Sequence, residues 1–308
     1  MSVYTRVEHE ELARWLQPLG LGVLVGYQGI SAGIQNSNYF VTTDQGRFVL
    51  TLFERIQADS LAFYLRFMAH LAERGIPCPQ PFKDTNAQLW RPLAGKPAAL
   101  LSCLPGSGVE QPTVKQCFAL GEMLAKLHIA GRDVPNPFPN PCGAAWRKAT
   151  GESLLPVLSA DERALLMAEL ADQEAQNYGD LPRGIIHADL FRDNVLWTKD
   201  GQLSGVLDFY FAGEDCLVFD LAVVANDWCL NDAALIQLLA GYISQRPLQA
   251  GEIAAWPVMR RAAALRFWLL RLEAKHRPRP GEVVTVKDPA YFAHLLKRLR
   301  LAPEPMPR

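Results

Sequence analysis

The chain has 308 residues, with 31 Lys or Arg against 32 Asp or Glu, so its formal net charge is −1. This near-neutral balance argues against a partner held by bulk electrostatics, such as nucleic acid. Hydrophobic residues make up 49% of the chain, yet no apolar run is long enough to span a bilayer, so we expect a globular protein of about two domains with no membrane partner.

Six cysteines are scattered at positions 78, 103, 117, 142, 216 and 229, and no two of them form a Cys-x-x-Cys pair. A thiolate metal site or a disulfide framework is therefore not expected, and we interpret the cysteines as reduced thiols. Residues 1–6 lack the apolar core of a signal peptide. These features favour a cytoplasmic protein, and they leave open whether it is a monomer or a dimer.

The first 104 residues have the pattern of a small sheet with two helices. Apolar side chains at helical spacing predict helices over residues 8–19 and 61–71. Strands are expected at residues 23–25, 39–42, 47–54, 89–90 and 97–104. The run Pro-Gly-Ser-Gly at 105–108 then breaks the chain, so we expect an N-terminal lobe over 1–104, a hinge near 102–106 and a C-terminal lobe over 105–308.

The loop between the first two predicted strands is rich in Gly, Ser and Asn. Gly29 and Gly33 would let backbone amides approach a phosphate closely, and Ser31 and Asn36 could add hydrogen bonds. Taken alone, this loop is equally consistent with an ordinary hairpin, because Gly-rich loops are common.

Residues 184–196, GIIHADLFRDNVL, are the most informative stretch, because a short apolar strand turns there into a polar loop. A second apolar run ends at Asp208, and the Asp-Gly step between the two runs predicts a hairpin turn. This layout is expected to bring Asp189, Asn194 and Asp208 to one end of a small β element. Two carboxylates and a carboxamide so placed suit Mg²⁺. The plainer alternative is that these side chains only cap turns.

The spacing His-x-Asp-x-x-x-x-Asn at residues 187–194, followed by Asp208, resembles the protein-kinase-like phosphotransferases of small molecules, the aminoglycoside and choline kinase group. The resemblance implies an α+β, bilobal fold with an antiparallel sheet and a helix in the N-terminal lobe and a mainly helical C-terminal lobe. It also implies phosphoryl transfer from ATP, with Asp189 as the base and Asn194 and Asp208 as Mg²⁺ ligands. His187 and the helix-borne Asp220 are expected to support the catalytic loop.

The same resemblance assigns a nucleotide site to the N-terminal lobe. It implies that the Gly-rich loop covers the phosphates and that the hinge backbone, including Ser102 and Leu104, meets the adenine. The sequence departs from the kinase pattern at Thr51, where such enzymes carry a phosphate-binding Lys or Arg, and the first lysine of the chain is Lys83. The metal and backbone amides would then have to carry more of the phosphate charge.

The C-terminal lobe is expected to be mainly helical. Apolar periodicity predicts a helix over residues 113–129, a capping-box pattern begins a second over 158–177, and mostly apolar runs predict helices over most of 215–229 and over 262–272. Ser159 and Glu162 have capping-box spacing, and His128 is interpreted as a helix-end histidine favoured by the macrodipole.

Polar residues on the last two of these helices have two interpretations. Asn226 and Asp227 either end their helix or face an acceptor pocket. Arg266 is either solvated or, if it is buried, in need of an anionic partner.

Three segments look like the bacterial homoserine kinases built on this fold: residues 40–43 followed by 48–54, residues 187–194, and residues 226–229 together with 264–268. Thr51 is part of that resemblance. It implies ATP-dependent phosphorylation of the side-chain hydroxyl of L-homoserine, in threonine biosynthesis.

Homoserine is a zwitterion, so its pocket needs a cation for the carboxylate and an acid for the ammonium group. Arg266 and Asp227 could supply this pair, because an arginine matches a carboxylate with two hydrogen bonds. Arg192 and Trp228 are further candidates for contact with the substrate.

Two alternatives remain open. The first is another small-molecule hydroxyl kinase of this fold, acting on an aminoglycoside, choline or another amino alcohol. The second is a nucleotide-binding pseudokinase, which Thr51 favours and which the intact set of Asp189, Asn194 and Asp208 disfavours.

Overall fold

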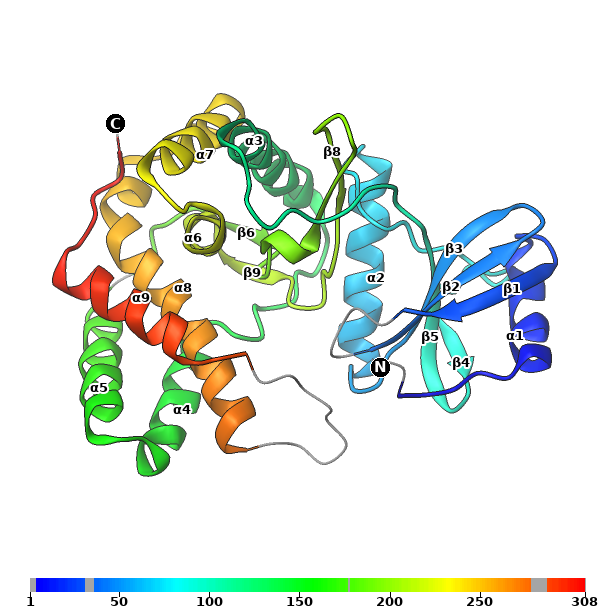
Figure 1. The fold of residues 1–308 in the computed structure, drawn as a ribbon, viewed down its shortest axis with the longest axis horizontal. Helices are drawn as coiled ribbons and strands as arrows, with labels where there is room; N and C mark the ends of the chain where they lie inside the picture. The colour runs from blue at the N-terminus through cyan, green and yellow to red at the C-terminus, as the bar shows by residue number, and fades with distance from the viewer. Residues whose placement is uncertain (1–3, 31–35, 177, 278–286, 308) are drawn as a thin grey trace. The chain divides into compact units, whose positions relative to one another are not determined.

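The computed structural model describes residues 4–30, 36–176, 178–277 and 287–307. The chain forms two compact units, one of residues 1–106 and 204–210 and the other of residues 107–203 and 211–308. Figure 1 follows the chain from the N-terminus to the C-terminus through both units. In the described part of the chain, no helix combines the length and the hydropathy needed to cross a bilayer.

The first unit contains a five-stranded antiparallel sheet with the strand order β1-β2-β3-β5-β4. Its strands are β1 (Leu24–Gly29), β2 (Ser37–Thr43), β3 (Gly46–Leu52), β4 (Arg91–Leu93) and β5 (Lys96–Ser102). Its helices are α1 (His9–Leu16), which continues as the 3₁₀ turn η1 (Gln17–Leu19), and α2 (Ala58–Glu73).

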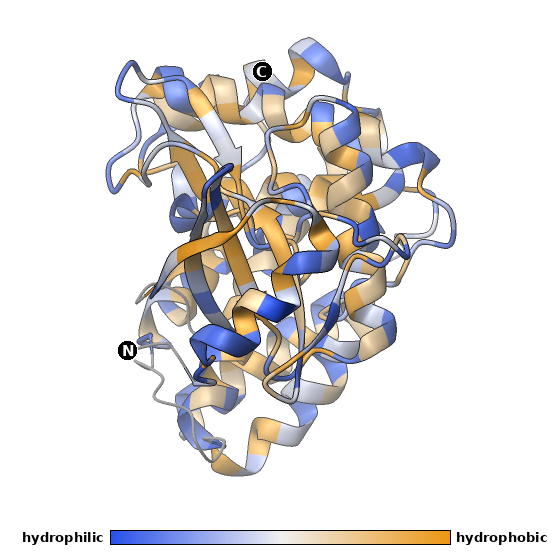
Figure 2. Cartoon of the chain, turned by 90° about the vertical axis from the view of Figure 1, so that its right-hand side faces the viewer, coloured by the Kyte–Doolittle hydropathy of each residue, from blue (hydrophilic) through white to orange (hydrophobic). Residues whose placement is uncertain are grey.

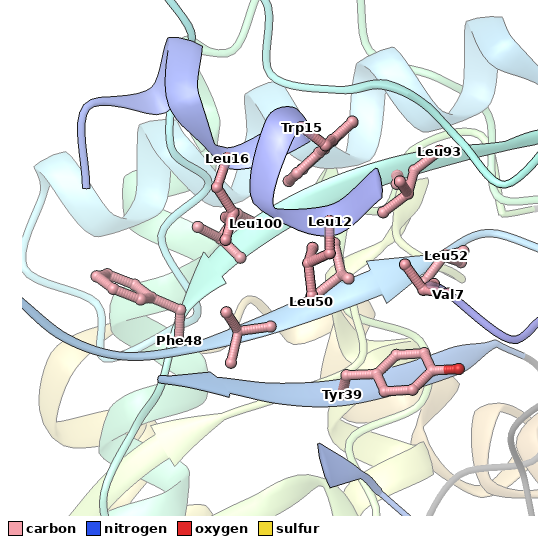
Figure 3. Close-up of a cluster of buried hydrophobic side chains, with 12 residues drawn as sticks. Val7, Leu12, Trp15, Leu16, Tyr39, Phe48, Leu50, Leu52, Leu93 and Leu100 are labelled. Atoms are coloured by element: carbon pink, nitrogen blue, oxygen red, sulfur yellow. The ribbon is translucent and has the colours of Figure 1, made fainter. Parts of the chain in front are cut away.

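The core of the first unit lies between one face of the sheet and α1. Alternate residues of a strand point to the same face, so Leu50 and Leu52 of β3 pack with Leu12 and Leu16 of α1. Figure 3 shows these side chains converging between the helix and the strands. The predicted amphipathic helix over 8–19 is thus confirmed, with its last turn tightened to a 3₁₀ form.

One strand of this unit begins later than expected. The sequence pattern predicts a strand at 89–90, but β4 covers Arg91–Leu93, so the prediction is wrong by two residues. The physical reason is a turn closed by Asp84, whose Oδ1 accepts hydrogen bonds from the backbone N–H groups of Asn86 and Gln88.

The second unit is mainly helical. Its helices are α3 (Val114–Ala130), α4 (Ala144–Leu154), α5 (Ala160–Glu174), α6 (Leu217–Trp228), α7 (Asp232–Gln245), α8 (Ala250–His276) and α9 (Ala290–Leu301), with the 3₁₀ turns η2 (Gly131–Asp133), η3 (Leu155–Val157) and η4 (Arg192–Asn194). Strands β6 (Arg183–Ile186) and β9 (Gly213–Cys216) form an antiparallel pair, and β7 (Val195–Trp197) follows η4. The predicted capping box of α5 is confirmed, because Ser159 and Glu162 exchange their hydrogen bonds.

Helix α6 is at the centre of this unit. All of its residues except Asp227 are buried, as expected of a helix that is apolar on every side. Figure 2 shows the apolar stretches of the helices and strands in orange, and hydrophilic residues mainly in loops and on outer helix faces. The polar residues of α6 are therefore held in an apolar environment, where each requires a partner.

The predicted turn at Asp200-Gly201 is confirmed. Thr198 accepts a hydrogen bond from Gly201 N–H at 3.0 Å and donates its own N–H to Gln202 at 2.9 Å. Gly201 has φ +75°, a conformation that glycine adopts without strain. Strand β8 (Leu203–Val206) starts after this turn, and at Ser204 the chain returns to the first unit.

Candidate active site

The polar loop that follows β6 begins with two buried residues, His187 and Ala188. The carboxylate of Asp220 on α6 accepts the backbone N–H of each of them at 2.8 Å. Ala188 has φ +65°, which is uncommon for a residue with a side chain. The contacts of Asp220 therefore hold the loop in a turn that its sequence alone does not favour.

Asp189 follows Ala188 and is half-buried. Its backbone N–H donates to Nδ1 of His187 at 3.2 Å. The Asn194 side-chain amide donates to the backbone oxygen of Asp189 at 2.8 Å and approaches its Oδ2 at 3.4 Å. These contacts do not use the side-chain oxygen of Asn194, which is the atom that could bind a cation.

The residues predicted to touch the substrate lie in the same loop or against it. Arg192 donates its backbone N–H at 2.8 Å and its Nε at 3.1 Å to Asp227, at the end of α6. Trp228 is buried and donates its indole N–H to the backbone oxygen of Leu190 at 3.0 Å. All three brace the loop, and their predicted role in substrate binding stays a prediction.

Asn226 lies in the last turn of α6, as the first of its two interpretations expects, and its place in an acceptor pocket stays a prediction. Helix α6 continues beyond it to Trp228, and its side chain exchanges hydrogen bonds with Arg260 of α8: Nδ2 donates to the backbone oxygen at 2.8 Å, and Oδ1 accepts from Nε at 3.0 Å. Asn226 therefore joins two helices of the second unit.

Arg266 on α8 is fully buried. Its Nη1 donates to the backbone oxygen of Ala188, and its guanidinium lies 4.9 Å and 4.5 Å from the ring centres of Phe211 and Phe267. Its Nε and Nη2 have no hydrogen-bond partner among the described residues. Burial raises the pKa of the nearby Cys142 thiol, and the charge of Arg266 opposes that rise.

His128 lies in the last turn of α3, as expected of a helix-end histidine, but its burial and its two side-chain partners were not predicted. It is buried, with Nε2 3.0 Å from Asp220 and Nδ1 2.8 Å from the hydroxyl of Tyr242. A signal for this exists in the sequence, because His128 continues the stripe of the buried Leu120 and Leu124 at intervals of four residues.

The first unit carries the residues predicted to meet the nucleotide. Ser31 and Gly33 lie outside the described residues, whereas Gly29 ends β1 and Asn36 is buried. Ser102 ends β5, and Leu104 lies half-buried two residues later. Ser102 exchanges hydrogen bonds with Gln80 through its N–H at 2.9 Å and its hydroxyl at 2.8 Å.

A hydroxyl takes the place expected for a phosphate-binding lysine. Thr51 on β3 is buried and donates to Oδ1 of Asn38 on the paired strand β2 at 2.8 Å. Its hydroxyl also bonds to Tyr210. Burial, and after it the charge of Asp208, raise the pKa of Tyr210.

Asp208 is held in the first unit by the residues on either side of it. Val206 donates its N–H to the backbone oxygen of Pro77 at 2.7 Å, and the ring of Tyr210 lies edge-on to Phe53 at a centroid distance of 5.2 Å. Asp208 itself has φ +62°, a backbone conformation that is uncommon for a residue with a side chain. Ala188, the residue before Asp189, has a similar conformation.

No cluster of three or more His, Cys, Asp or Glu side chains in the described residues could hold a metal ion by itself. The predicted metal ligands are the carboxylate of Asp208 and the carboxamide of Asn194. Such a small set of oxygen donors fits Mg²⁺, which keeps several waters and binds substrate phosphates.

Comparison with known proteins identifies the group to which this chain is related. Residues 26–265 match the model of the phosphotransferase enzyme family. The chain belongs to this family. Its curated relatives include the homoserine kinase of Methylobacillus flagellatus, 48% identical over 96% of this chain and 95% of the relative, and that of Neisseria meningitidis serogroup B, 45% identical over 97% and 100%.

Solved structures of phosphotransferases show the same protein-kinase-like fold. An amicoumacin kinase in complex with AMP-PNP and Ca²⁺ is 15% identical, covers 97% of each chain and has a TM-score of 0.68. Choline kinase LicA from Streptococcus pneumoniae is 14% identical, covers 96% of this chain and 98% of its own, and has a TM-score of 0.66. The predicted α+β, kinase-like fold is therefore confirmed.

Proposed function

We propose that this protein is a kinase that transfers a phosphoryl group from ATP to the side-chain hydroxyl of L-homoserine, giving O-phospho-L-homoserine for threonine biosynthesis. The observation that carries the proposal is its 43–48% identity, over nearly the whole chain, to eight homoserine kinases. We place the enzyme in the cytoplasm, with its nucleotide co-substrate.

Asp189 is the proposed catalytic base. It orients the hydroxyl of the acceptor and accepts its proton as the phosphoryl group arrives. Its position is supported from two sides, because Asn194 bonds to its backbone oxygen and Asp220 holds the two residues before it. His187 and Asp220 support the loop and do not take part in the chemistry.

A divalent cation, which we propose to be Mg²⁺, would be held by Asn194 and Asp208. When bound, it supplies positive charge to the phosphate oxygens. Because a hydroxyl stands at Thr51 where a lysine is usual, this charge matters more in the present chain than in a kinase that has the lysine.

The nucleotide is proposed to bind to the first unit. Its phosphates would meet the backbone of the loop after β1, with Gly29, Ser31, Gly33 and Asn36. Its adenine would meet the chain at the end of β5, at Ser102 and Leu104.

The homoserine carboxylate is proposed to bind to Arg266. Nε and Nη2, the two nitrogens without a described partner, lie on one edge of the guanidinium, and such an edge matches the two oxygens of a carboxylate. Asp227, whose two carboxylate oxygens both contact Arg192, would attract the ammonium group through its negative charge, and Arg192 and Trp228 would lie beside the bound substrate.

The test is ATP consumption by the purified protein with L-homoserine, 3-aminopropanol, choline and an aminoglycoside as acceptors. We expect consumption to depend on homoserine and the other acceptors to be poor. Preference for another acceptor would move the protein to a different kinase of the same fold. Nucleotide binding without consumption for any acceptor would identify a pseudokinase.

A further inference from the structure

A continuous series of buried hydrogen bonds runs from the loop after β6, residues 187–194, to the start of α8. We call this loop the catalytic loop, because it carries the proposed base Asp189. Asp220 accepts two backbone N–H groups of the loop and also contacts Nε2 of His128 on α3. Nδ1 of His128 contacts the hydroxyl of Tyr242 on α7. Arg246 donates to that hydroxyl at 3.1 Å and forms two bonds, of 2.9 and 3.1 Å, to Glu252.

The donors along this series have one consistent direction. The ionised carboxylate of Asp220 can only accept, so Nε2 of His128 must carry a proton. In a neutral ring Nδ1 then accepts, and Tyr242 donates its hydroxyl proton to it. The same hydroxyl oxygen accepts from Arg246. This arrangement assigns the Nε2–H form to His128.

Both ends of this series of hydrogen bonds are charged side chains, Asp220 at one end and the Arg246–Glu252 pair at the other. Burial opposes ionisation of Asp220, but the bonds from His128 and from the His187 backbone outweigh it and lower the pKa of the carboxyl. Burial likewise opposes the charge of Arg246, and the two bonds to Glu252 outweigh it and raise the pKa of the guanidinium. Each end is therefore a stable ion inside the protein.

We propose that Tyr242, Arg246 and Glu252 position the catalytic loop, acting through His128 and Asp220. Tyr242 fixes the tautomer and the ring orientation of His128, and the Arg246–Glu252 pair fixes Tyr242. Glu252 also accepts the N–H of Gln249 at 2.9 Å, so it is anchored to the first turn of α8. A buried network of this kind is worth more when every member is satisfied.

The variant that tests the proposal is Tyr242→Phe, which removes the hydroxyl and keeps the ring. Tyr178→Phe is the matched control, because its hydroxyl also donates one hydrogen bond inside the second unit, to Gln173 at 2.8 Å, outside this series. Glu252→Gln is a second test variant, which removes the charge that pairs with Arg246, and it serves if Tyr242→Phe does not fold.

The first measurement is amide hydrogen exchange in peptides covering residues 184–194. The N–H groups of His187 and Ala188 are protected only while Asp220 is held in place, so we expect exchange at least about fivefold faster in Tyr242→Phe and Glu252→Gln than in the wild type or Tyr178→Phe. Unchanged exchange in this segment, with faster exchange confined to α3 and α7, would overturn the proposal. This measurement requires no activity, so it decides the matter even if the proposed function is wrong.

The second measurement is kinetic and rests on the proposed function. We expect kcat with homoserine to fall about 3- to 10-fold in Tyr242→Phe, with KM for ATP and homoserine unchanged. In a His128→Gln background, Tyr242→Phe should cost little more, because the hydroxyl acts only through His128. A loss in the double variant equal to the product of the two single losses would show that Tyr242 contributes to packing independently.

Discussion

The proposed role of Asp189 as the base depends on the residues that hold its backbone in place. Asn194 bonds to its backbone oxygen, and His187 accepts its N–H. The preceding residue, Ala188, has its N–H bonded to Asp220 and its carbonyl to Arg266. At the scale of single residues, orientation and chemistry are thus assigned to different side chains, and substitutions should separate them.

Asp189→Asn should remove nearly all turnover and leave ATP binding largely intact. The amide keeps the shape of the side chain but cannot accept the proton of the acceptor hydroxyl. We expect turnover, measured by a coupled assay, to fall at least about a hundredfold, and ATP affinity, measured by calorimetry, to change little. A variant that keeps a third of the wild-type rate would exclude Asp189 as the base.

Arg266→Lys should lower kcat/KM for homoserine about 10- to 150-fold, because a charge-assisted bond to a buried ion is worth about 1.5–3 kcal/mol and an ammonium cannot make the two-point contact. ATP affinity should hardly change. The same variant also weakens the bond to Ala188, so 3-aminopropanol, which lacks the carboxylate, is the control acceptor. Equal losses for both acceptors would show that Arg266 acts on the loop and not on the substrate.

The residues of the catalytic loop could be predicted because their spacing is local, from His187 to Asn194. The partners of His128 could not, because Tyr242 is 114 residues away and its hydroxyl meets the ring only after α3 and α7 have packed. Distant polar contacts of this kind leave no periodic signal in a sequence, since a buried tyrosine looks like any other apolar residue of its helix.

Helices were predictable where an apolar stripe runs along one side, as in α1 and α3, where a capping box begins the helix, as in α5, or where the whole segment is apolar, as in α6. The way these helices pack against one another could not be predicted from the sequence. Helices α3 and α7 pack closely through two glycines, since a Cβ atom at Gly121 would clash with the backbone oxygen of Leu238 and one at Gly241 with that of Phe118. This contact brings Tyr242 to His128, so the spacing of the two helices sets the geometry of the loop's support.

Gly241→Ala should therefore destabilise the second unit, even though alanine is the better helix former. The added methyl meets backbone that cannot yield without moving the helices apart, and we expect a loss of about 2–4 kcal/mol in the free energy of unfolding, read by denaturant titration. Gly251→Ala in α8 is the control, because its Cβ meets Leu181 at an ordinary 3.4 Å, and it should change stability by less than about 1 kcal/mol. Equal effects of the two substitutions would argue against the close approach of α3 and α7.

At the scale of the whole molecule, chain order and structural unit do not coincide. Residues 204–210 follow the catalytic loop in sequence, yet they belong to the first unit, where Tyr210 bonds to Thr51 and packs on Phe53. No pattern in the sequence indicates this return, because it depends on contacts across more than 100 residues. It places Asp208 in the same unit as the residues proposed to bind the nucleotide.

Asp208→Ala should abolish activity at any practical Mg²⁺ concentration, and Asn194→Ala should raise the Mg²⁺ concentration required for half-maximal rate. Both residues are proposed to bind the metal through oxygen, but a carboxylate contributes charge and a carboxamide does not, so the first loss should be the larger. Asp200→Ala, in the exposed turn after β7, is the control and should leave the Mg²⁺ titration unchanged. If Asp208→Ala and Asn194→Ala both gave the wild-type titration curve, the two side chains would be turn-capping residues, and the phosphate charge would have to be neutralised elsewhere in the protein.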